Sequence, residues 1–199
     1  ENLVMLEKFL NGEITDDEFM ADDIRLWTEV QPRIHRDDIM RCYSGIGLMK
    51  GARDVVEELS RRGIFVAIVS AGVDIFVGVI ANMLSVDDWA ANGFDWDDEG
   101  WLNGPSPTRV YSHDKGIMVE KLSRIKELEP ESIISVGDSS TDLSMMIPGS
   151  KFIGFNPARQ RASDAFEDAG VPVVNSKDLR DIWEHIFEGE SFIHSGEGN

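Results

Sequence analysis

The chain has 199 residues, of which 42% are apolar and 9% aromatic, and it carries a formal net charge of −18. This length and composition can bury one sizeable core, or one core with a small accessory subdomain, and they exclude a disordered chain. The charge, with no basic patch in the sequence, argues against nucleic acid and anionic membranes as partners.

The sequence also lacks the marks of a membrane or exported protein. No stretch reaches the roughly eighteen consecutive apolar residues of a membrane helix, and the opening ENLVMLEKFLNGE lacks the basic-then-apolar order of a signal peptide. We therefore expect a soluble, cytoplasmic protein. The single cysteine, Cys42, has no metal-type partner spacing and is expected to be a reduced structural thiol. Nothing in the pattern indicates an oligomeric state.

The first part of the chain, about residues 1–47, is predicted to be helical throughout. The apolar positions that repeat at helical spacing are Leu3, Leu6 and Leu10 in a first helix, and Met20, Ile24 and Trp27 in a second. Thr15 and Glu18 have the spacing of a capping box at the start of the second helix. The segment RDDIMRCY, residues 36–43, predicts a third short helix.

From residue 48 the pattern alternates between helix and strand, which is typical of an α/β fold with a doubly wound parallel sheet. The segment GARDVVEELSRRG predicts a helix, and the apolar run IFVAIVS, residues 64–70, predicts a strand that helices cover on both faces. A helix is expected over 74–84, followed by a β-hairpin over 91–104. The later expected elements are a helix from Lys115 with Met118, Leu122 and Ile125 on one face, strands at 132–137, 151–155 and 171–174, a short helix closed by Pro148, a helix to Gly170, and a helix through Leu179, Ile182, Trp183 and Ile186.

The change of pattern sets the predicted domain organisation. We expect a small helical cap over residues 1–47, an α/β core over 48–188 and a loose tail over 189–199. No linker rich in proline, glycine or serine separates the first two parts.

Ligands of open parallel sheets bind at the carboxyl ends of the strands, so polar residues that follow a strand are candidate site residues. Ser70 ends the run IFVAIVS. Its hydroxyl and the N–H groups of Ala71 and Gly72 are expected to open a helix N-terminus, where the dipole and unpaired donors favour a phosphate group. The simpler alternative is that Ser70 only caps that helix.

Two carboxylates follow the apolar strand SIISVG, namely Asp138 directly after it and Asp142 four residues on. Carboxylates beside a core are costly unless something pairs with them, and a metal ion is the expected partner. The alternative is that they are N-cap and first-turn residues of the next helix. Lys115, at the start of an earlier helix, is by itself an ordinary surface charge, and His113 beside it is expected to be a loop residue.

In chain order, these segments resemble the second, third and fourth motifs of the haloacid dehalogenase superfamily, and most of all those of its phosphoserine phosphatase-like branch. The resemblance covers about residues 12–185 and rests on GARDVVEELSRRGIFVAIVSAGVD, the hairpin ANGFDWDDEGWLNG, DKGIMVEKL and SVGDSSTDLSMM. It implies a Rossmann-like core and a Mg²⁺-dependent phosphatase that acts on a small phosphorylated metabolite through an aspartyl-phosphate.

The resemblance also implies a role for each candidate residue. Asp138 would coordinate Mg²⁺ directly, and Asp142 would coordinate it or hold a ligand water. Ser70 and Lys115 would bind phosphoryl oxygens, together with the N–H groups after Ser70, and Lys115 would also neutralise the nucleophile. A metal, a lysine and a helix N-terminus at one point suit phosphoryl transfer, which depends on positioning and on neutralising charge.

Three features depart from the family pattern. The first motif, Asp-x-Asp-x-Thr/Val, supplies the nucleophile and the general acid but does not occur in the chain. We expect a segment that carries it to precede Glu1 in the parent protein, the alternative being a natural relic. Thr141 stands where many relatives have Asn. The cap stretch EFMADDIRLW offers one cation for a substrate carboxylate, Arg25, so we expect a substrate with a neutral or cationic leaving group.

Two other functions remain compatible with these motifs. A catalytically silent member of the superfamily would keep the fold and serve as a binding or regulatory partner. A phosphotransferase would pass the phosphoryl group to an acceptor alcohol. A response-regulator receiver is a further doubly wound fold, but it would not explain the helical cap.

Overall fold

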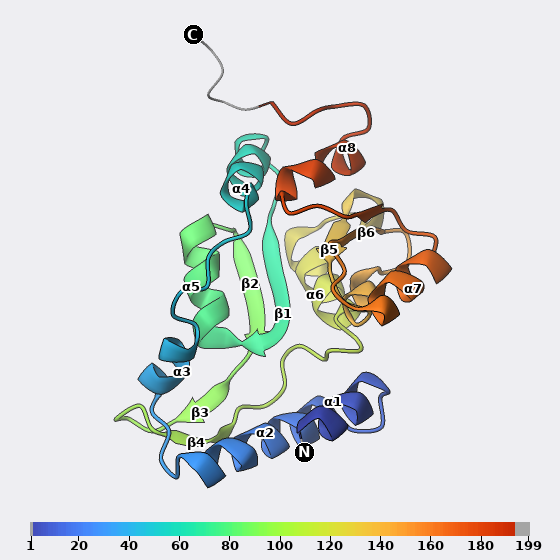
Figure 1. Ribbon diagram of the computed structural model, residues 1–199. Helices are drawn as coiled ribbons and strands as arrows, with labels where there is room; N and C mark the ends of the chain where they lie inside the picture. The colour runs from blue at the N-terminus through green and yellow to red at the C-terminus, as the bar shows by residue number, and fades with distance from the viewer. Residues whose placement is uncertain (1, 194–199) are drawn as a thin grey trace.

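The structure, a computed structural model, describes residues 2–193 (Figure 1). It opens with the three predicted helices, α1 (Asn2–Leu10), α2 (Asp16–Val30) and α3 (Arg36–Cys42). The capping box of Thr15 and Glu18 at the start of α2 is confirmed. The predicted apolar face of α1 is wrong in part, because Leu3 is exposed and Phe9 is buried, stacked on Phe19. Part of the predicted tail lies outside the described residues.

The rest of the chain alternates between helices and strands as predicted. The elements in order are α4 (Ala52–Arg61), β1 (Ala67–Val73), α5 (Asp74–Leu84), β2 (Asp88–Asn92), β3 (Phe94–Trp96), β4 (Leu102–Pro105), α6 (Gly116–Lys126), η1 (Pro130–Ser132), β5 (Ile134–Gly137), η2 (Asp142–Met145), β6 (Lys151–Phe155), α7 (Gln160–Asp168), β7 (Val173–Val174), η3 (Leu179–Ile182) and α8 (Trp183–Ile186). The hairpin β3–β4 is antiparallel and lies against α2 (Figure 1).

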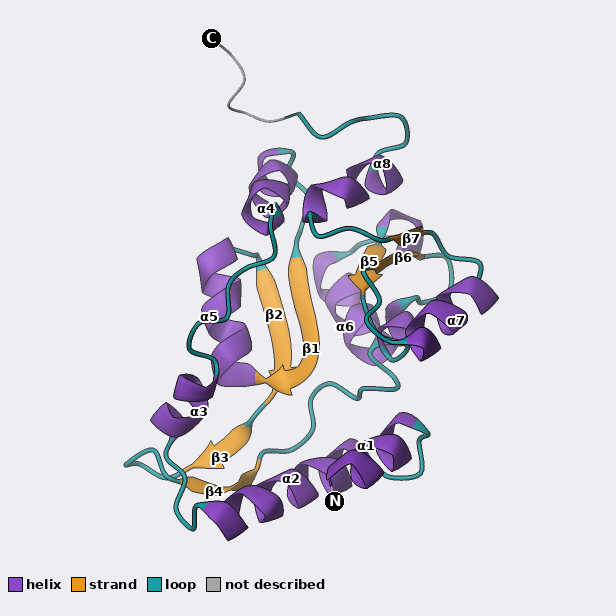
Figure 2. Cartoon of the chain, in the orientation of Figure 1, coloured by secondary structure: helices purple, strands orange, loops and turns teal. Residues whose placement is uncertain are grey.

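The parallel strands form two sheets in the described chain. β1 pairs with β2 in one sheet, and β5, β6 and β7 pair in that order in the other. Among the described residues no ladder joins β1 to β5, so each of these strands has one unpaired edge. Figure 2 shows β1, β2 and β5 running toward the end of the molecule where α1 and α2 lie.

Side chains join the two sheets where backbone hydrogen bonds do not. Val69 of β1 packs against a cluster that includes Val119 of α6 and Phe152 of β6. A second cluster around Trp183 brings α4, β6 and β7 together. The apolar stripe of α4 is confirmed, because Ala52, Val55, Val56 and Leu59 are all buried.

The observed elements differ from the predicted ones in four places. β2 was not predicted, because its segment DWAAN begins with an aspartate and is short. The buried face of α6 carries Val119 and Ser123, whereas Ile125 is exposed, so the predicted stripe is rotated. The helix before Pro148 is the single 3₁₀ turn η2, and the last predicted helix begins as the 3₁₀ turn η3.

Candidate functional site

Ser70 lies within β1 and does not end it, which corrects the prediction. The strand continues through Ala71 and Gly72 to Val73, with an irregular register between Ser70 and Val73, and α5 begins at Asp74. Ser70 therefore neither opens the helix nor caps it. Its Oγ accepts a hydrogen bond from the Gly72 N–H at 3.0 Å, which holds this irregular segment in a tight turn.

Lys115 is buried and ion-paired, so its interpretation as a surface charge is wrong. Only 7% of its surface is exposed, and its ammonium donates to Oδ1 of Asp142, which is itself 8% exposed. Lys115 stands at the N-cap position of α6, and its own N–H donates to Ser144 Oγ at 3.0 Å. The loop after β5 and the start of α6 are thereby fixed to each other.

The second oxygen of Asp142 organises the loop after β5. Oδ2 accepts hydrogen bonds from the Asp138 N–H at 3.1 Å and from the Ser139 N–H and Oγ at 3.0 Å each. Burial acts to raise the pKa of Asp142, but the Lys115 ammonium and the Ser139 donors outweigh it, so the pKa lies below its ordinary value. Asp142 thus has partners on both oxygens.

Asp138 has a different environment. Its side chain reaches solvent, and within residues 2–193 it makes no ion pair. The pKa of Asp138 is nevertheless raised above its ordinary value of 3.8. The main cause is partial burial, which removes water from the carboxylate, and the second is the negative charge of Asp142. Asp138 does not cap a helix, because Thr141 holds the N-cap position of η2.

This donor set fits a magnesium ion only in part. Mg²⁺ commonly takes one or two carboxylates and keeps several waters, and Asp138 offers an accessible carboxylate whose charge is not neutralised. In the described part of the chain, no three histidine, cysteine, aspartate or glutamate side chains form a group able to hold a metal. The remaining ligands would therefore be waters, the substrate or a further segment of protein.

The cap holds the loop that leads to Lys115, residues 106–115. Asp16, at the start of α2, accepts hydrogen bonds from the N–H and hydroxyl of Ser112, and Asp17 accepts one from Thr108. His113 hydrogen-bonds the Phe9 carbonyl at 2.8 Å. We call these three contacts the cap latch.

Arg25, the predicted cap contact to substrate, is engaged along its own helix. Its guanidinium donates to Asp22 Oδ1 at 2.8 and 3.1 Å and to Glu29 Oε1 at 2.6 Å, and half of its side chain is exposed. A substrate carboxylate would have to compete with both acidic partners for it.

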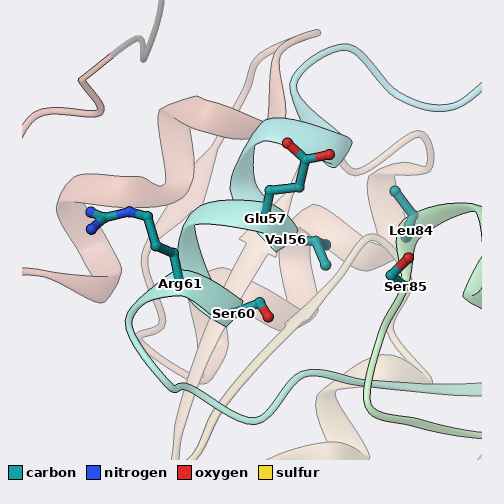
Figure 3. Close-up of a pocket in the computed structure, with 6 residues that line it drawn as sticks. All are labelled: Val56, Glu57, Ser60, Arg61, Leu84 and Ser85. Atoms are coloured by element: carbon teal, nitrogen blue, oxygen red, sulfur yellow. The ribbon is translucent and has the colours of Figure 1, made fainter.

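A surface hollow of about 290 Å³ lies away from these residues (Figure 3). Its lining residues are Val56, Glu57, Ser60, Arg61, Leu84 and Ser85. They belong to the ends of α4 and α5 that precede β1 and β2, so the hollow faces the amino ends of the strands. It contains none of the predicted site residues.

Comparison with known proteins decides the family. The profile of the haloacid dehalogenase-like hydrolase family matches residues 9–146. The chain belongs to this family. Within it, the chain falls in the phosphoserine phosphatase-like branch. It is 32% identical to the phosphoserine phosphatase of Methanocaldococcus jannaschii over an alignment of 151 residues. This alignment covers 75% of the present chain and 69% of that protein.

A further relative and a solved structure support the same assignment to the phosphoserine phosphatase-like branch. The phosphoserine phosphatase of Archaeoglobus fulgidus is 29% identical over 88% of this chain, which spans only about half, 48%, of that protein. A solved structure titled as a phospho-aspartyl intermediate analogue of phosphoserine phosphatase superposes with a TM-score of 0.76 at 26% identity, covering 93% of this chain and 84% of that one.

The structure adds residues to the candidate site that the sequence did not indicate. Asp16 and Asp17 follow the predicted capping residue Thr15 and were given no role, and Asn92 was included only as part of the predicted hairpin segment. In the sequence, Gly137 was only the residue that precedes Asp138. The structure shows that this position requires glycine, because a side chain there would collide with Asp142. Within residues 2–193 no helix is long and apolar enough to cross a membrane, and the cytoplasmic location stays a prediction.

Proposed function

We propose that the chain is the main part of a Mg²⁺-dependent phosphatase that hydrolyses a small phosphate monoester through an aspartyl-phosphate. The observation that carries the proposal is the buried ion pair of Lys115 and Asp142 directly beside the accessible carboxylate of Asp138. A buried lysine, an organised loop and an uncompensated carboxylate at the end of a parallel strand suit phosphoryl transfer.

Each residue would have a separate task. Asp138 would hold Mg²⁺ together with waters, and Asp142 would orient Lys115 and the Asp138 loop. Ser70 can still donate its hydroxyl proton to a phosphoryl oxygen while it accepts from Gly72, and the Ala71 N–H would add a donor. The Gly72 N–H would have to leave Ser70 Oγ before it could donate to the phosphoryl group. Bound Mg²⁺ would neutralise part of the phosphoryl charge.

The nucleophile would come from one further parallel strand between β1 and β5. Both strands have an unpaired edge, and no residue of β1 is fully buried although Ala67, Ile68 and Val69 are apolar, whereas four of the five residues of β6 are buried. Unpaired backbone groups beside a core are costly, so a strand there would complete the sheet.

That strand would end in the Asp-x-Asp motif that the family resemblance implies. The first carboxylate would attack phosphorus as the bond to the alcohol oxygen breaks, and the second would give that oxygen a proton. The same second carboxylate would then take a proton from the water that hydrolyses the acyl phosphate, which releases inorganic phosphate and restores the nucleophile.

Asp138→Asn tests this proposal. In the whole protein the substitution is expected to abolish Mg²⁺-dependent hydrolysis of a generic phosphate ester while leaving stability equal or higher. The metal loses a charged ligand, but the neutral amide removes the repulsion between Asp138 and Asp142 in the metal-free protein. Hydrolysis at saturating ester and fixed Mg²⁺, with thermal unfolding in EDTA, measures both effects.

Exposed Asp98, on the turn of the hairpin, offers the matched control, because Asp98→Asn removes a charge far from β5. Unchanged hydrolysis in Asp138→Asn would show that Asp138 has no part in catalysis. A wild-type protein that binds Mg²⁺ but never releases phosphate would favour the catalytically silent alternative. Turnover that requires an acceptor alcohol would identify a phosphotransferase.

The engagement of Arg25 leads to an expectation about specificity. A substrate carboxylate would meet the acidic face of α2 at a cost on the order of 1 kcal/mol, since like charges repel even near the surface. The whole protein is therefore expected to turn over phosphoethanolamine with a higher kcat/KM than phosphoserine. The names of the relatives favour phosphoserine, so this comparison is decisive.

A preference for phosphoserine of about tenfold or more would contradict the expectation. In that case Arg25→Ala identifies the carboxylate site. A large loss for phosphoserine alone would show that Arg25 leaves Asp22 and Glu29 to bind substrate, and no loss would assign the carboxylate to another residue.

A further inference from the structure

Asn92 is the most deeply buried polar residue near the site, and none of the roles above uses it. It is the last residue of β2, opposite Val73 in the register of β1, and only 2% of its surface is exposed. A buried amide must satisfy its donors and acceptor within the protein, so its partners show what it holds in place.

The Asn92 side chain binds three successive peptide groups in the backbone of the loop 106–115. Its Oδ1 accepts from the N–H groups of Arg109 and Val110 at 2.9 and 2.8 Å, and its Nδ2 donates to the Val110 carbonyl at 2.7 Å. Val110 is 1% exposed, so solvent cannot replace these bonds. This loop leads to Lys115.

The same Nδ2 also reaches the other phosphate-binding segment. It donates to the Ala71 carbonyl at 3.4 Å, between Ser70 and Gly72. In the described residues no direct hydrogen bond joins the Ser70 segment to Lys115 or Asp142. Asn92 is therefore a direct link between two segments that are distant along the chain, since its partners Ala71 and Arg109 lie 38 positions apart.

We propose that Asn92 is a positioning residue that sets the distance between the Ser70–Gly72 segment and the Lys115 loop. The inference rests on the proposed function, because those segments are the ones that would bind the phosphoryl group. Small displacements of groups that must converge on one phosphate reduce both binding and turnover. Asn92 itself would touch neither the substrate nor the metal.

Asn92→Asp tests the link with the smallest change in shape. A carboxylate can still accept from Arg109 and Val110, but it cannot donate to the carbonyls of Val110 and Ala71. In the whole protein we expect Ki for inorganic phosphate to rise about tenfold and kcat to fall by a similar factor, since one or two buried hydrogen bonds are lost. Asn92→Leu, which loses all four, should show a larger effect.

Ser123→Ala is the matched control. Ser123 is also a buried polar residue, whose Oγ donates to the Leu128 carbonyl at 2.8 Å, but it lies in the later part of α6. It should lower Tm while Ki and kcat stay within about twofold of the wild type. The proposal is overturned if Asn92→Asp behaves in the same way, with a lower Tm and unchanged Ki and kcat.

Hydrogen exchange of the wild type provides a first measurement that needs no variant. In the wild type, inorganic phosphate should slow amide exchange at Arg109 and Val110 together with Gly72, and slowing at only one of the two segments would contradict the link. If the wild type binds no phosphate, the proposed function fails by itself. The link is then tested by comparing amide exchange in Asn92→Asp with exchange in the wild type, both without phosphate. Faster exchange in both the Ser70–Gly72 segment and the loop 106–115 supports the link, and faster exchange in only one of them overturns it.

Discussion

Lys115→Met should lower the free energy of unfolding of the whole protein by about 3 to 5 kcal/mol, because it leaves the buried carboxylate of Asp142 without its counter-ion. Hydrolysis should be lost as well, since the lysine is expected to bind the phosphoryl group. Urea unfolding at neutral pH measures the stability, and Lys121→Met, at an exposed position on the same helix, provides the control.

The pH dependence of this loss of unfolding free energy is set by the pKa of Asp142. In the wild type its pKa is lowered below the ordinary value of 3.8, so its contribution to stability is present above that value and is lost as the pH falls through the lowered pKa. Without Lys115, burial would raise the pKa instead. The difference in stability between wild type and Lys115→Met should therefore shrink as the pH falls toward 3.8.

A double-mutant cycle separates the pair from its surroundings. Asp142→Asn removes the charge but also weakens the acceptor for the Asp138 and Ser139 amides, so it should destabilise by itself. Adding Lys115→Met to Asp142→Asn should cost less than Lys115→Met alone, because no buried charge is then left unpaired. Additive losses would mean that the two side chains do not form a pair.

Gly137→Ala should disrupt the site although the substitution adds one methyl group. A Cβ on Gly137 would lie 2.3 Å from Cβ and 2.8 Å from Cγ of Asp142, so the aspartate would have to move. We expect a loss of about 1 to 3 kcal/mol in stability, as for other overpacked positions, and a fall in hydrolysis of at least about tenfold.

Gly104→Ala on β4 is the control for this substitution, because a Cβ there meets nothing within 4 Å. Circular dichroism with urea unfolding gives the stability, and phosphate release gives the activity. If Gly137→Ala kept wild-type hydrolysis, the position of Asp142 would not matter for the reaction.

The sequence predicted the elements and the polar residues of one half of the site. Asp138 and Asp142 follow an apolar strand, and this simple pattern was enough to locate the loop after β5. The ion pair with Lys115 could not be predicted from pattern alone, because it depends on how α6 meets that loop in space. The family resemblance placed Lys115 in the same site, as a group that binds phosphoryl oxygens and neutralises the nucleophile, but it did not predict the ion pair with Asp142.

Other features depend on backbone detail that composition does not encode. The irregular register of β1 carries the strand three residues past Ser70, and no propensity distinguishes this from a strand that ends there. Asn92 was missed because it ends a strand that was not predicted, and an asparagine at the start of the predicted hairpin resembles any turn residue. Its role became visible only when its four hydrogen-bond partners were known.

The cap latch couples the helices α1 and α2 to the loop that ends at Lys115. Asp16, Asp17 and Phe9 belong to the cap, and the groups that they hold lie on the loop that ends at Lys115. Any outward swing of α1 and α2 must break these contacts or carry that loop along. A displacement of these helices is thereby transmitted to the residues that immediately precede the ion pair of Lys115 and Asp142.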